Sequence, residues 1–189
     1  MRKGDPITTY SGVDFYILDP RPEDFLDVDM AHALSLLCRG NGHYQYFYSV
    51  AQHCLNCLRE AQGRGYGPRL QMACLVHDGS EAYLSDITRP VKQYLAAYQE
   101  YEHVIQRMVF EHYGIGDLTE DEFSQLAAVD DTVLYYEFAA LHRAFPGNVP
   151  EKHTMFDFSL RQAQDVEKQF LQEIDKLRSM LQRGRGKTG

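Results

Sequence analysis

Tryptophan is absent from this chain, cysteine is scarce, and long apolar runs are missing. No window approaches the roughly 18 consecutive apolar residues that a membrane-spanning helix requires. The opening MRKGDPITTY is not followed by the apolar core of a secretory signal peptide. We therefore expect a cytoplasmic protein that has no membrane as a partner.

The chain has only four cysteines among 189 residues and no secretory signal. We therefore do not expect a disulfide framework. Cys54 and Cys57 make a C-x-x-C pair, but no second C-x-x-C follows. We interpret the pair as small core residues on a helix. Zinc or redox chemistry is the weaker alternative.

Basic residues are fewer than acidic ones, with 19 Lys and Arg against 27 Asp and Glu, which gives a net charge of -8. This balance repels polyanions, so we expect no long nucleic acid as the main partner. A small phosphorylated ligand needs only a local basic pocket. The length and the 44% hydrophobic content are typical of one folded globular domain.

Internal repeats and runs of alternating strand residues are missing as well, whereas apolar residues recur at helical spacing. We predict an all-α fold, a compact bundle of about six to eight helices. Residues 1–26 are expected to form an extended arm that packs on the domain, 27–183 the bundle and 184–189 a flexible tail. The predicted helices span 28–38, 50–61, 69–78, 80–84, 88 to 98 or 112, 119–145 and 158–182.

Several residues are predicted to start or end these helices. Ser49 suits an N-cap, and Thr119 with Glu122 three residues on suits a capping box. Asp27 is expected to cap the first helix. Gly79 is placed where a glycine commonly closes a helix.

Polar residues interrupt the apolar faces of three predicted helices. His53 continues the stripe Val50, Cys54 and Cys57, and His77 ends the stripe Leu70, Ala73 and Cys74. Asp130 and Glu137 lie on the apolar face of the helix 119–145. A carboxylate buried alone costs several kcal/mol, so each needs a metal, an arginine or a histidine as a partner.

Taken singly, each of these residues is a plausible hydrogen-bonded core residue. Taken together, two inward histidines, the adjacent Asp78 and the remote Asp130 form a mixed nitrogen and oxygen ligand set. Such a set suits one divalent transition metal, Mn, Co, Zn, Fe or Ni, better than calcium or magnesium. Sites inside helical bundles are commonly built in this way from facing helices.

The pattern His53, His77-Asp78 and Asp130 resembles that of the HD-domain metal-dependent phosphohydrolases. The run HDGSEAYLSDITRPVK, residues 77–92, is similar to the bacterial 5'-deoxynucleotidase branch and to phage deoxynucleoside triphosphohydrolases, as are MAHALSLLCRGNGHY and YSVAQHC. The similarity covers roughly residues 27–145. It implies an HD-type bundle whose metal is held by His53, His77, Asp78 and Asp130. Asp130 is preferred to Asp131 because it lies on the apolar face, seven residues before Glu137.

The resemblance also implies roles in catalysis. Asp78 would combine metal binding with a place beside the reacting phosphate. Glu81, four residues after His77, is our candidate general base, which orients or deprotonates the attacking water. A solvated surface glutamate is the alternative reading.

Other positions are assigned to the substrate. Arg39, 14 residues before His53, matches a family arginine that contacts substrate, and Asp86 matches an aspartate near the nucleotide sugar. Arg89 and Lys92 would add positive charge at the pocket mouth, or be solvated at the surface. His43 is a further candidate for phosphate contact.

One departure from the family concerns the sugar. The deoxynucleotidase branch has a tryptophan after the arginine that helps to exclude ribose, whereas here Gly40 follows Arg39. Tyr44, Tyr46 or Phe47 would have to supply a substitute aromatic wall.

We therefore expect a metal-dependent phosphohydrolase that acts on nucleotides, a 5'-nucleotidase for (deoxy)nucleoside monophosphates. One alternative uses the same site to release triphosphate from a dNTP. The other is a non-catalytic scaffold that keeps the metal for stability. The partner is a small-molecule nucleotide, and the sequence leaves homo-oligomerisation open.

Overall fold

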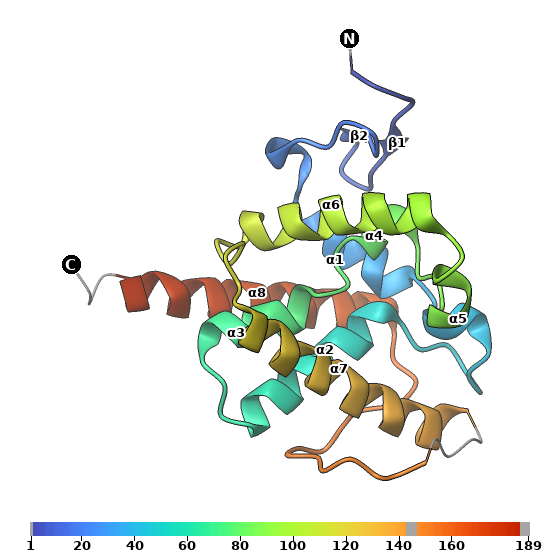
Figure 1. The fold of residues 1–189 in the computed structure, drawn as a ribbon, viewed down its shortest axis with the longest axis vertical. Helices are drawn as coiled ribbons and strands as arrows, with labels where there is room; N and C mark the ends of the chain where they lie inside the picture. Colours follow the sequence, from blue (N-terminus) through green and yellow to red (C-terminus); the bar gives the residue numbers. More distant parts are fainter. Residues whose placement is uncertain (1, 143–146, 186–189) are drawn as a thin grey trace.

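Helices make up most of the computed structural model in Figure 1, which describes residues 2–142 and 147–185. In chain order they are α1 (Asp27–Leu36), α2 (Val50–Gly63), α3 (Pro68–Val76), α4 (Glu81–Leu84), α5 (Arg89–Lys92), α6 (Ala96–His112), α7 (Glu120–Leu141) and α8 (Ala163–Arg185). Short 3₁₀ helices η1 (Pro22–Asp24) and η2 (Arg39–Gly42) flank α1. The predicted helical fold class is confirmed.

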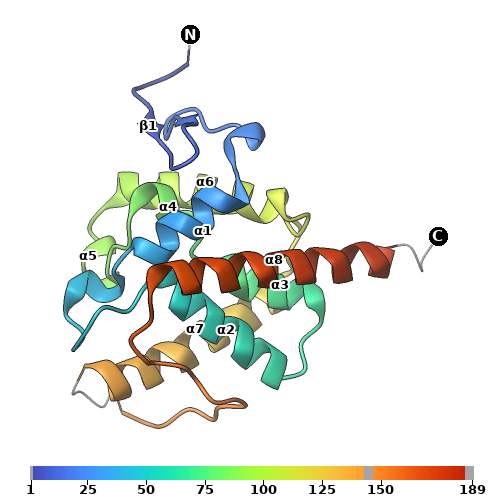
Figure 2. The same cartoon turned by 180° about the vertical axis from the view of Figure 1, so that it is seen from behind.

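Helix α2 lies at the centre of the bundle, where it contacts α1, α3, α7 and α8. Nearly every residue from Val50 to Ala61 is buried, whichever way it points. Figure 2 shows α8 crossing the back of the molecule, over α1 and α3. A helix that is enclosed on all sides has little access to water. Its polar residues therefore need hydrogen-bond partners within the protein.

Three polar residues of α2 fix the segment that connects α7 to α8. The Asn56 side chain donates to the Asp157 carbonyl at 3.0 Å, and the Asp157 backbone N–H donates back to Asn56 at 3.0 Å. Gln52 donates to the Ser159 carbonyl at 3.0 Å. Glu60 accepts the backbone N–H of His153. These bonds hold the described residues 147–162 of the connection against the core.

The predicted helix starts at Ser49 and Thr119 are confirmed. The Ser49 side chain accepts the N–H of Gln52, and Thr119 and Glu122 form a reciprocal capping box. Asp27 does not cap α1, because Leu26 occupies that position and makes no side-chain cap. The Asp27 carboxylate instead accepts hydrogen bonds from Tyr113 at 2.8 Å and Arg178 at 2.7 Å. It therefore joins α1 to the residue that ends α6 and to α8.

Gly79 does not close α3 in the expected manner. The helix ends at Val76, and Gly79 is not among the glycines with positive φ. A Cβ at Gly79 would lie 2.8 Å from Val109 Cγ1 and 2.9 Å from Met30 Sδ. Glycine is needed here because α1 and α6 pack directly against the backbone that follows α3.

The amino-terminal arm is not simply extended. It folds back as an antiparallel hairpin of β1 (Ile7–Thr8) and β2 (Asp14–Phe15), with Ile7 paired to Phe15. The Phe15 ring is fully buried and stacks on Tyr83 of α4, with 3.9 Å between ring centroids. The arm therefore contributes to the core beside the residues that follow His77.

Other boundaries differ from the prediction. The chain from Arg89 to His112 forms two helices, α5 and α6, and Phe158 lies in the connection that precedes α8. Helix α7 is described to Leu141, and its expected end at Phe145 falls outside the described residues. Helix α8 extends to Arg185, two residues into the expected tail, and the rest of that tail is likewise outside. Among the described residues, no helix combines the length and apolar character of a membrane span.

The contacts of Asp27 predict a pH-dependent contribution to stability. Burial raises the pKa of Asp27, but hydrogen bonds from His112, Arg178 and Tyr113 outweigh it and lower the pKa from 3.8 to about 2. A depressed folded-state pKa stabilises the protein above the unfolded value and loses that effect as the pH falls. Asp27→Asn should therefore cost about 1–2 kcal/mol at pH 7, for a partly solvated carboxylate, and roughly half as much at pH 3.

Urea unfolding of wild type and variant between pH 7 and pH 3 measures this difference. Asp175→Asn is the matched control, because Asp175 also contacts Arg178, at 3.7 Å, but is 79% exposed. A constant difference between wild type and Asp27→Asn across this range would contradict the prediction.

Candidate metal centre

Two histidines from different helices face each other at the centre of the fold. His53 lies in the first turns of α2 and is fully buried, and His77 follows the last residue of α3. The two Nε2 atoms are 3.3 Å apart. Helices α2 and α3 pack side by side, which brings together residues that are 24 positions apart in the chain.

The other ring nitrogens of both histidines are already hydrogen-bonded. His53 Nδ1 lies 2.7 Å from a carboxylate oxygen of Glu137, and His77 Nδ1 lies 3.0 Å from the carbonyl oxygen of Cys74. Both partners are acceptors, so each Nδ1 carries the proton. In the neutral rings both Nε2 atoms then present lone pairs to the same point. Metal-binding histidines are commonly oriented in this way by a carboxylate or a backbone carbonyl.

Two aspartates complete the cluster. Asp130 Oδ1 is 3.1 Å from His53 Nε2 and 3.8 Å from His77 Nε2. Asp78 Oδ2 is 3.4 Å from His77 Nε2 and 3.7 Å from His53 Nε2. Asp131 points away, is 63% exposed and pairs with Arg89. Of the two neighbouring aspartates, Asp130 is the one that faces the histidines.

The donor set fits a divalent transition metal. Ligands bound at about 2.0–2.2 Å to one ion lie about 3–4 Å apart, as these nitrogen and oxygen atoms do. Asp130 Oδ1 is also buried and makes no hydrogen bond, although it faces the Nε2 atoms of both histidines. A cation between these three atoms would give each of them a partner.

The electric field at the cluster also favours a cation. Burial lowers the pKa of His77, but the charge of Asp78 and the nearby carboxylate of Asp130 outweigh it, so this pKa lies well above its usual value. Burial raises the pKa of Asp130, but the two histidines lower it well below its usual value. The negative potential that holds a proton on a ring also attracts a metal ion.

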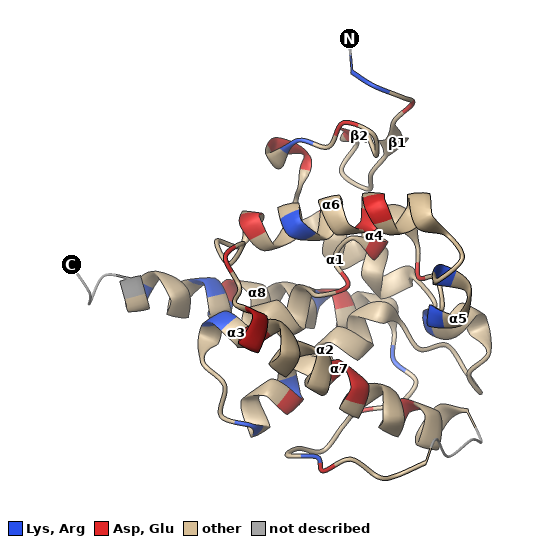
Figure 3. Cartoon of the chain, in the orientation of Figure 1, with Lys and Arg blue, Asp and Glu red and all other residues tan. Residues whose placement is uncertain are grey.

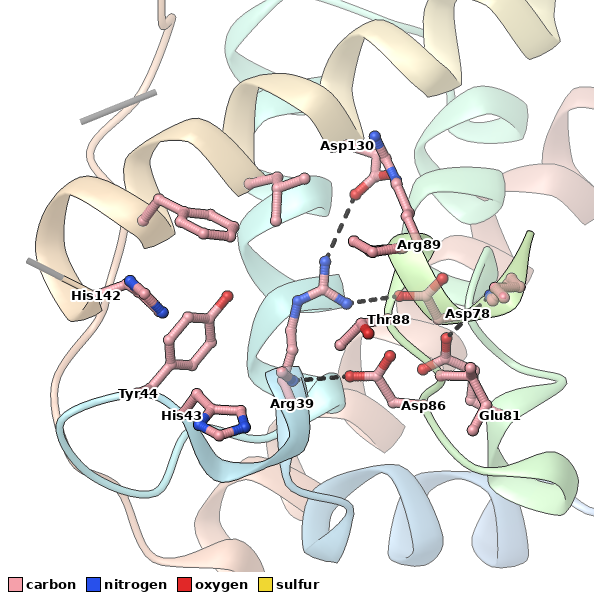
Figure 4. A pocket seen from close by; sticks show the side chains of 16 residues that line it. Arg39, His43, Tyr44, Asp78, Glu81, Asp86, Thr88, Arg89, Asp130 and His142 are labelled. Carbon is pink, nitrogen blue, oxygen red and sulfur yellow. Dashed lines mark hydrogen bonds and ion pairs between the residues drawn. The ribbon is translucent and has the colours of Figure 1, made fainter. Parts of the chain in front are cut away.

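Arg39 is held between the carboxylates of this centre. It opens η2, where its Nε donates to Glu137 at 3.1 Å and its Nη1 to Asp78 at 3.2 Å, while Nη2 is 3.7 Å from Asp130. Figure 4 shows its guanidinium pointing between Asp78 and Asp130. One face of the cluster is therefore covered by a fixed positive charge.

A cavity of about 540 Å³ opens beside Asp78 and Asp130. All of the expected substrate residues line it: Arg39, His43, Asp86, Arg89 and Lys92. In Figure 4 Tyr44 and His142 lie on the opposite side of Arg39 from Glu81 and Asp78. The volume is within the range of about 300–1,000 Å³ that is typical of small-molecule sites.

Glu81 lies in this cavity with no hydrogen bond to one of its oxygens. It is the first residue of α4, its side chain is 4% exposed, and Oε2 is buried without a partner. Burial raises the pKa of Glu81 well above its usual value, and the charges of Asp78 and Asp86 raise it further. The ammonium nitrogen of Lys92 is 3.9 Å from Oε1. The carboxyl is therefore poised to take up a proton.

The remaining substrate candidates differ in their freedom to bind a ligand. Asp86 accepts the backbone N–H of Gly40 at 2.9 Å. Arg89 spans Asp130 and Asp131 at 2.6 and 2.7 Å, and Lys92 pairs with Glu102. Figure 3 shows the two basic residues of α5 at one end of the molecule.

The sequence prediction gave no role in the site to three residues that the structure places there. Glu137 was recognised only as an inward carboxylate, although it binds both His53 and Arg39. Cys57 was assigned to the core, yet its Sγ is 3.4 Å from His53 Nε2. Phe138 lines the aromatic side of the cavity. Helical spacing from His53 and Asp130 was the available signal for Cys57 and Glu137.

Comparison with known proteins identifies relatives without an assigned activity. No family model matches the chain. It is 37% identical over 109 residues to the uncharacterized protein YfdR of Escherichia coli (strain K12), which is 58% of each chain. It is 33% identical over 129 residues, 65% of each chain, to an uncharacterized protein of Rhodobacter capsulatus. The aligned parts are thus less than two thirds of these relatives.

Asp130 and Asp131 provide a matched pair for testing the centre. Asp130→Asn should weaken Mn²⁺, Co²⁺ or Zn²⁺ binding more than about 100-fold, because even an outer partner of a ligand contributes 10- to 100-fold. Asp131→Asn should retain about one ion per chain, because it loses only an exposed ion pair to Arg89. Elemental analysis and metal titration measure both effects. Equal loss of metal in the two variants would remove Asp130 from the ligand set.

Proposed function

We propose that this protein is a metal-dependent phosphohydrolase that removes the 5'-phosphate from nucleoside monophosphates. One observation carries the proposal. The Nε2 atoms of His53 and His77 converge with oxygens of Asp78 and Asp130 beside a cavity that also holds Glu81.

Phosphate ester hydrolysis needs an activated water and neutralisation of the phosphoryl charge. A bound divalent ion supplies Lewis-acid activation of water and part of that neutralisation. Arg39 adds a guanidinium fixed by Glu137 and Asp78, so it is positioned before substrate arrives. Glu81 has an unpartnered oxygen and a raised pKa, which suits it to accept a proton from the attacking water.

The polarity of the cavity supports a nucleotide as substrate. Asp78, Asp130 and Arg39 lie at its centre, whereas Leu134, Phe138 and Tyr44 supply apolar surface. Tyr44 and His142 also make an edge-to-face contact, with ring centroids 6.3 Å apart. A phosphate would lie near the charged residues, and a flat base would contact the aromatic residues.

Tyr44 provides the aromatic surface next to the residue that follows Arg39. A Cβ at Gly40 would lie 3.4 Å from the Tyr44 ring. Tyr46 bonds instead to the Phe158 carbonyl, and neither Tyr46 nor Phe47 lines the cavity. Tyr44 is therefore our candidate for contact with the sugar, in place of the tryptophan of the resembling family.

The ion pairs at the cavity favour a monophosphate over a triphosphate. Arg89 is paired with Asp130 and Asp131, and Lys92 with Glu102. A triphosphate would require these side chains to leave carboxylates that already neutralise them. Release of triphosphate from a dNTP is therefore the less favoured use of the site.

A non-catalytic scaffold is a poorer account of the same residues. Structural metal sites are usually enclosed by their ligands, whereas two of the proposed ligands here, Asp78 and Asp130, line a cavity with room for water or substrate. A scaffold also has no use for Glu81, because a buried carboxyl oxygen without a hydrogen-bond partner destabilises the fold.

A substrate panel tests the proposed reaction. We expect hydrolysis of nucleoside 5'-monophosphates to nucleoside and inorganic phosphate in the presence of Mn²⁺, Co²⁺ or Zn²⁺, with deoxyribose forms preferred. Tyr44→Ala should reduce that preference, because it opens space beside the sugar. Phosphate release is measured for ribo and deoxy mono-, di- and triphosphates. Triphosphate release would favour the alternative reaction, and no turnover of any substrate would favour the scaffold.

Glu81→Gln should separate metal binding from catalysis. The variant loses the proton acceptor but not a proposed ligand, so metal content should be unchanged. Hydrolysis should fall about 10²- to 10⁴-fold, the usual contribution of a positioned general base. Glu102→Gln is the control, because Glu102 also pairs with Lys92 but does not line the cavity. A rate for Glu81→Gln within about threefold of wild type would make Glu81 a bystander.

A further inference from the structure

Two buried cysteine thiols lie near the histidine pair. Cys54 and Cys57 are three residues apart on α2, and neither is exposed. Cys57 Sγ lies 3.4 Å from His53 Nε2, the nitrogen that faces His77 and Asp130. The thiol therefore lies on the metal-facing side of the imidazole, not beside the Nδ1 that binds Glu137.

This position is that of a ligand. Potential ligand atoms of His53, Cys57, His77 and Asp130 all lie within 4.8 Å of one another. A nitrogen at about 2.0 Å and a sulfur at about 2.3 Å from one ion are about 3.0–3.5 Å apart when the angle between the two bonds is about 90–110°. The separation between Cys57 Sγ and His53 Nε2 lies in this range.

Helix geometry explains why Cys57 and His53 meet. They are four residues apart on α2, so their side chains are stacked on one face of the helix. Hydrogen bonds from Gln52 and Asn56 to the segment 147–162 also fix the rotation of α2 about its own axis. The thiol is thus fixed at the centre by the fold.

We propose that Cys57 is a sulfur ligand of this metal centre, which makes it a mixed nitrogen, oxygen and sulfur site for a thiophilic divalent ion. The inference rests on the metal centre of the proposed function. Coordination replaces the S–H bond with a sulfur–metal bond, the proton leaves to solvent, and no electron is transferred. Such a set selects Zn²⁺, Co²⁺ or Cd²⁺ over Mg²⁺ and Mn²⁺, which prefer oxygen.

Cobalt titration of the metal-depleted full chain reads sulfur ligation directly. Wild type should show a near-ultraviolet sulfur-to-cobalt charge-transfer band that saturates at one ion per chain. Cys57→Ser should lose the band while still binding cobalt. Cd²⁺ affinity of the variant should fall at least about 10-fold, with Mn²⁺ affinity changed less than about threefold.

Two other buried cysteines of the described residues serve as matched controls. Cys54 groups with His77 and Asp78, and Cys74 contributes only its carbonyl to His77. Cys54→Ser and Cys74→Ser should both keep the band. A band that survives in Cys57→Ser, or that depends on Cys54, would overturn the assignment.

X-ray absorption of the zinc-loaded wild type needs no variant and is independent of folding effects. A sulfur neighbour near 2.3 Å, distinct from nitrogen and oxygen near 2.0–2.1 Å, is expected. Stoichiometric zinc with only nitrogen and oxygen neighbours would overturn the sulfur ligand and leave the proposed hydrolase intact. Failure to bind zinc or cobalt at all would overturn both.

Discussion

The buried carboxylate of Glu137 determines where the parts of the centre meet. Burial raises its pKa, but the charges and hydrogen bonds of His53 and Arg39 outweigh burial and hold the pKa below its usual value. An unpaired charge here would cost several kcal/mol, so α2, η2 and α7 must bring these three residues together. Asp130 lies seven residues earlier, two turns along α7, and therefore faces the Nε2 side of the same imidazole.

The same arrangement concentrates negative charge. The cavity is lined by four carboxylates, those of Asp78, Glu81, Asp86 and Asp130. Among the described cavity residues, Arg39 is the one cation that contacts three carboxylates, those of Asp78, Asp130 and Glu137. A protein gains no stability by placing like charges together. A divalent ion would neutralise them, so binding of such an ion would stabilise the folded protein.

Periodicity predicted much of this from the sequence, because polar residues on apolar helical faces had to find partners. Together with the spacing from Glu137 it favoured Asp130 over Asp131, and capping residues identified the starts of α2 and α7 at Ser49 and Thr119. It could not give distances. Gly79 resembled a helix stop and Asp27 resembled a cap, because their contacts come from helices distant in sequence. Cys57 resembled any small core residue, because its spacing from His53 does not show that its thiol lies beside Nε2.

Candidate metal ligands are easier to predict from the sequence than residues that contact a substrate, because the two groups lie on elements of different length. His53 and Asp130 belong to the long helices α2 and α7, whose register is fixed by the core, and His77 and Asp78 directly follow α3. The residues proposed to contact substrate belong to η2, α5 and the residues before α5, which are segments only a few residues long. Such segments tolerate sequence change, and specificity is commonly located there. A metal centre of this kind could therefore serve different substrates, and in the proposed function Tyr44 beside Gly40 is the residue in which such a local difference would act.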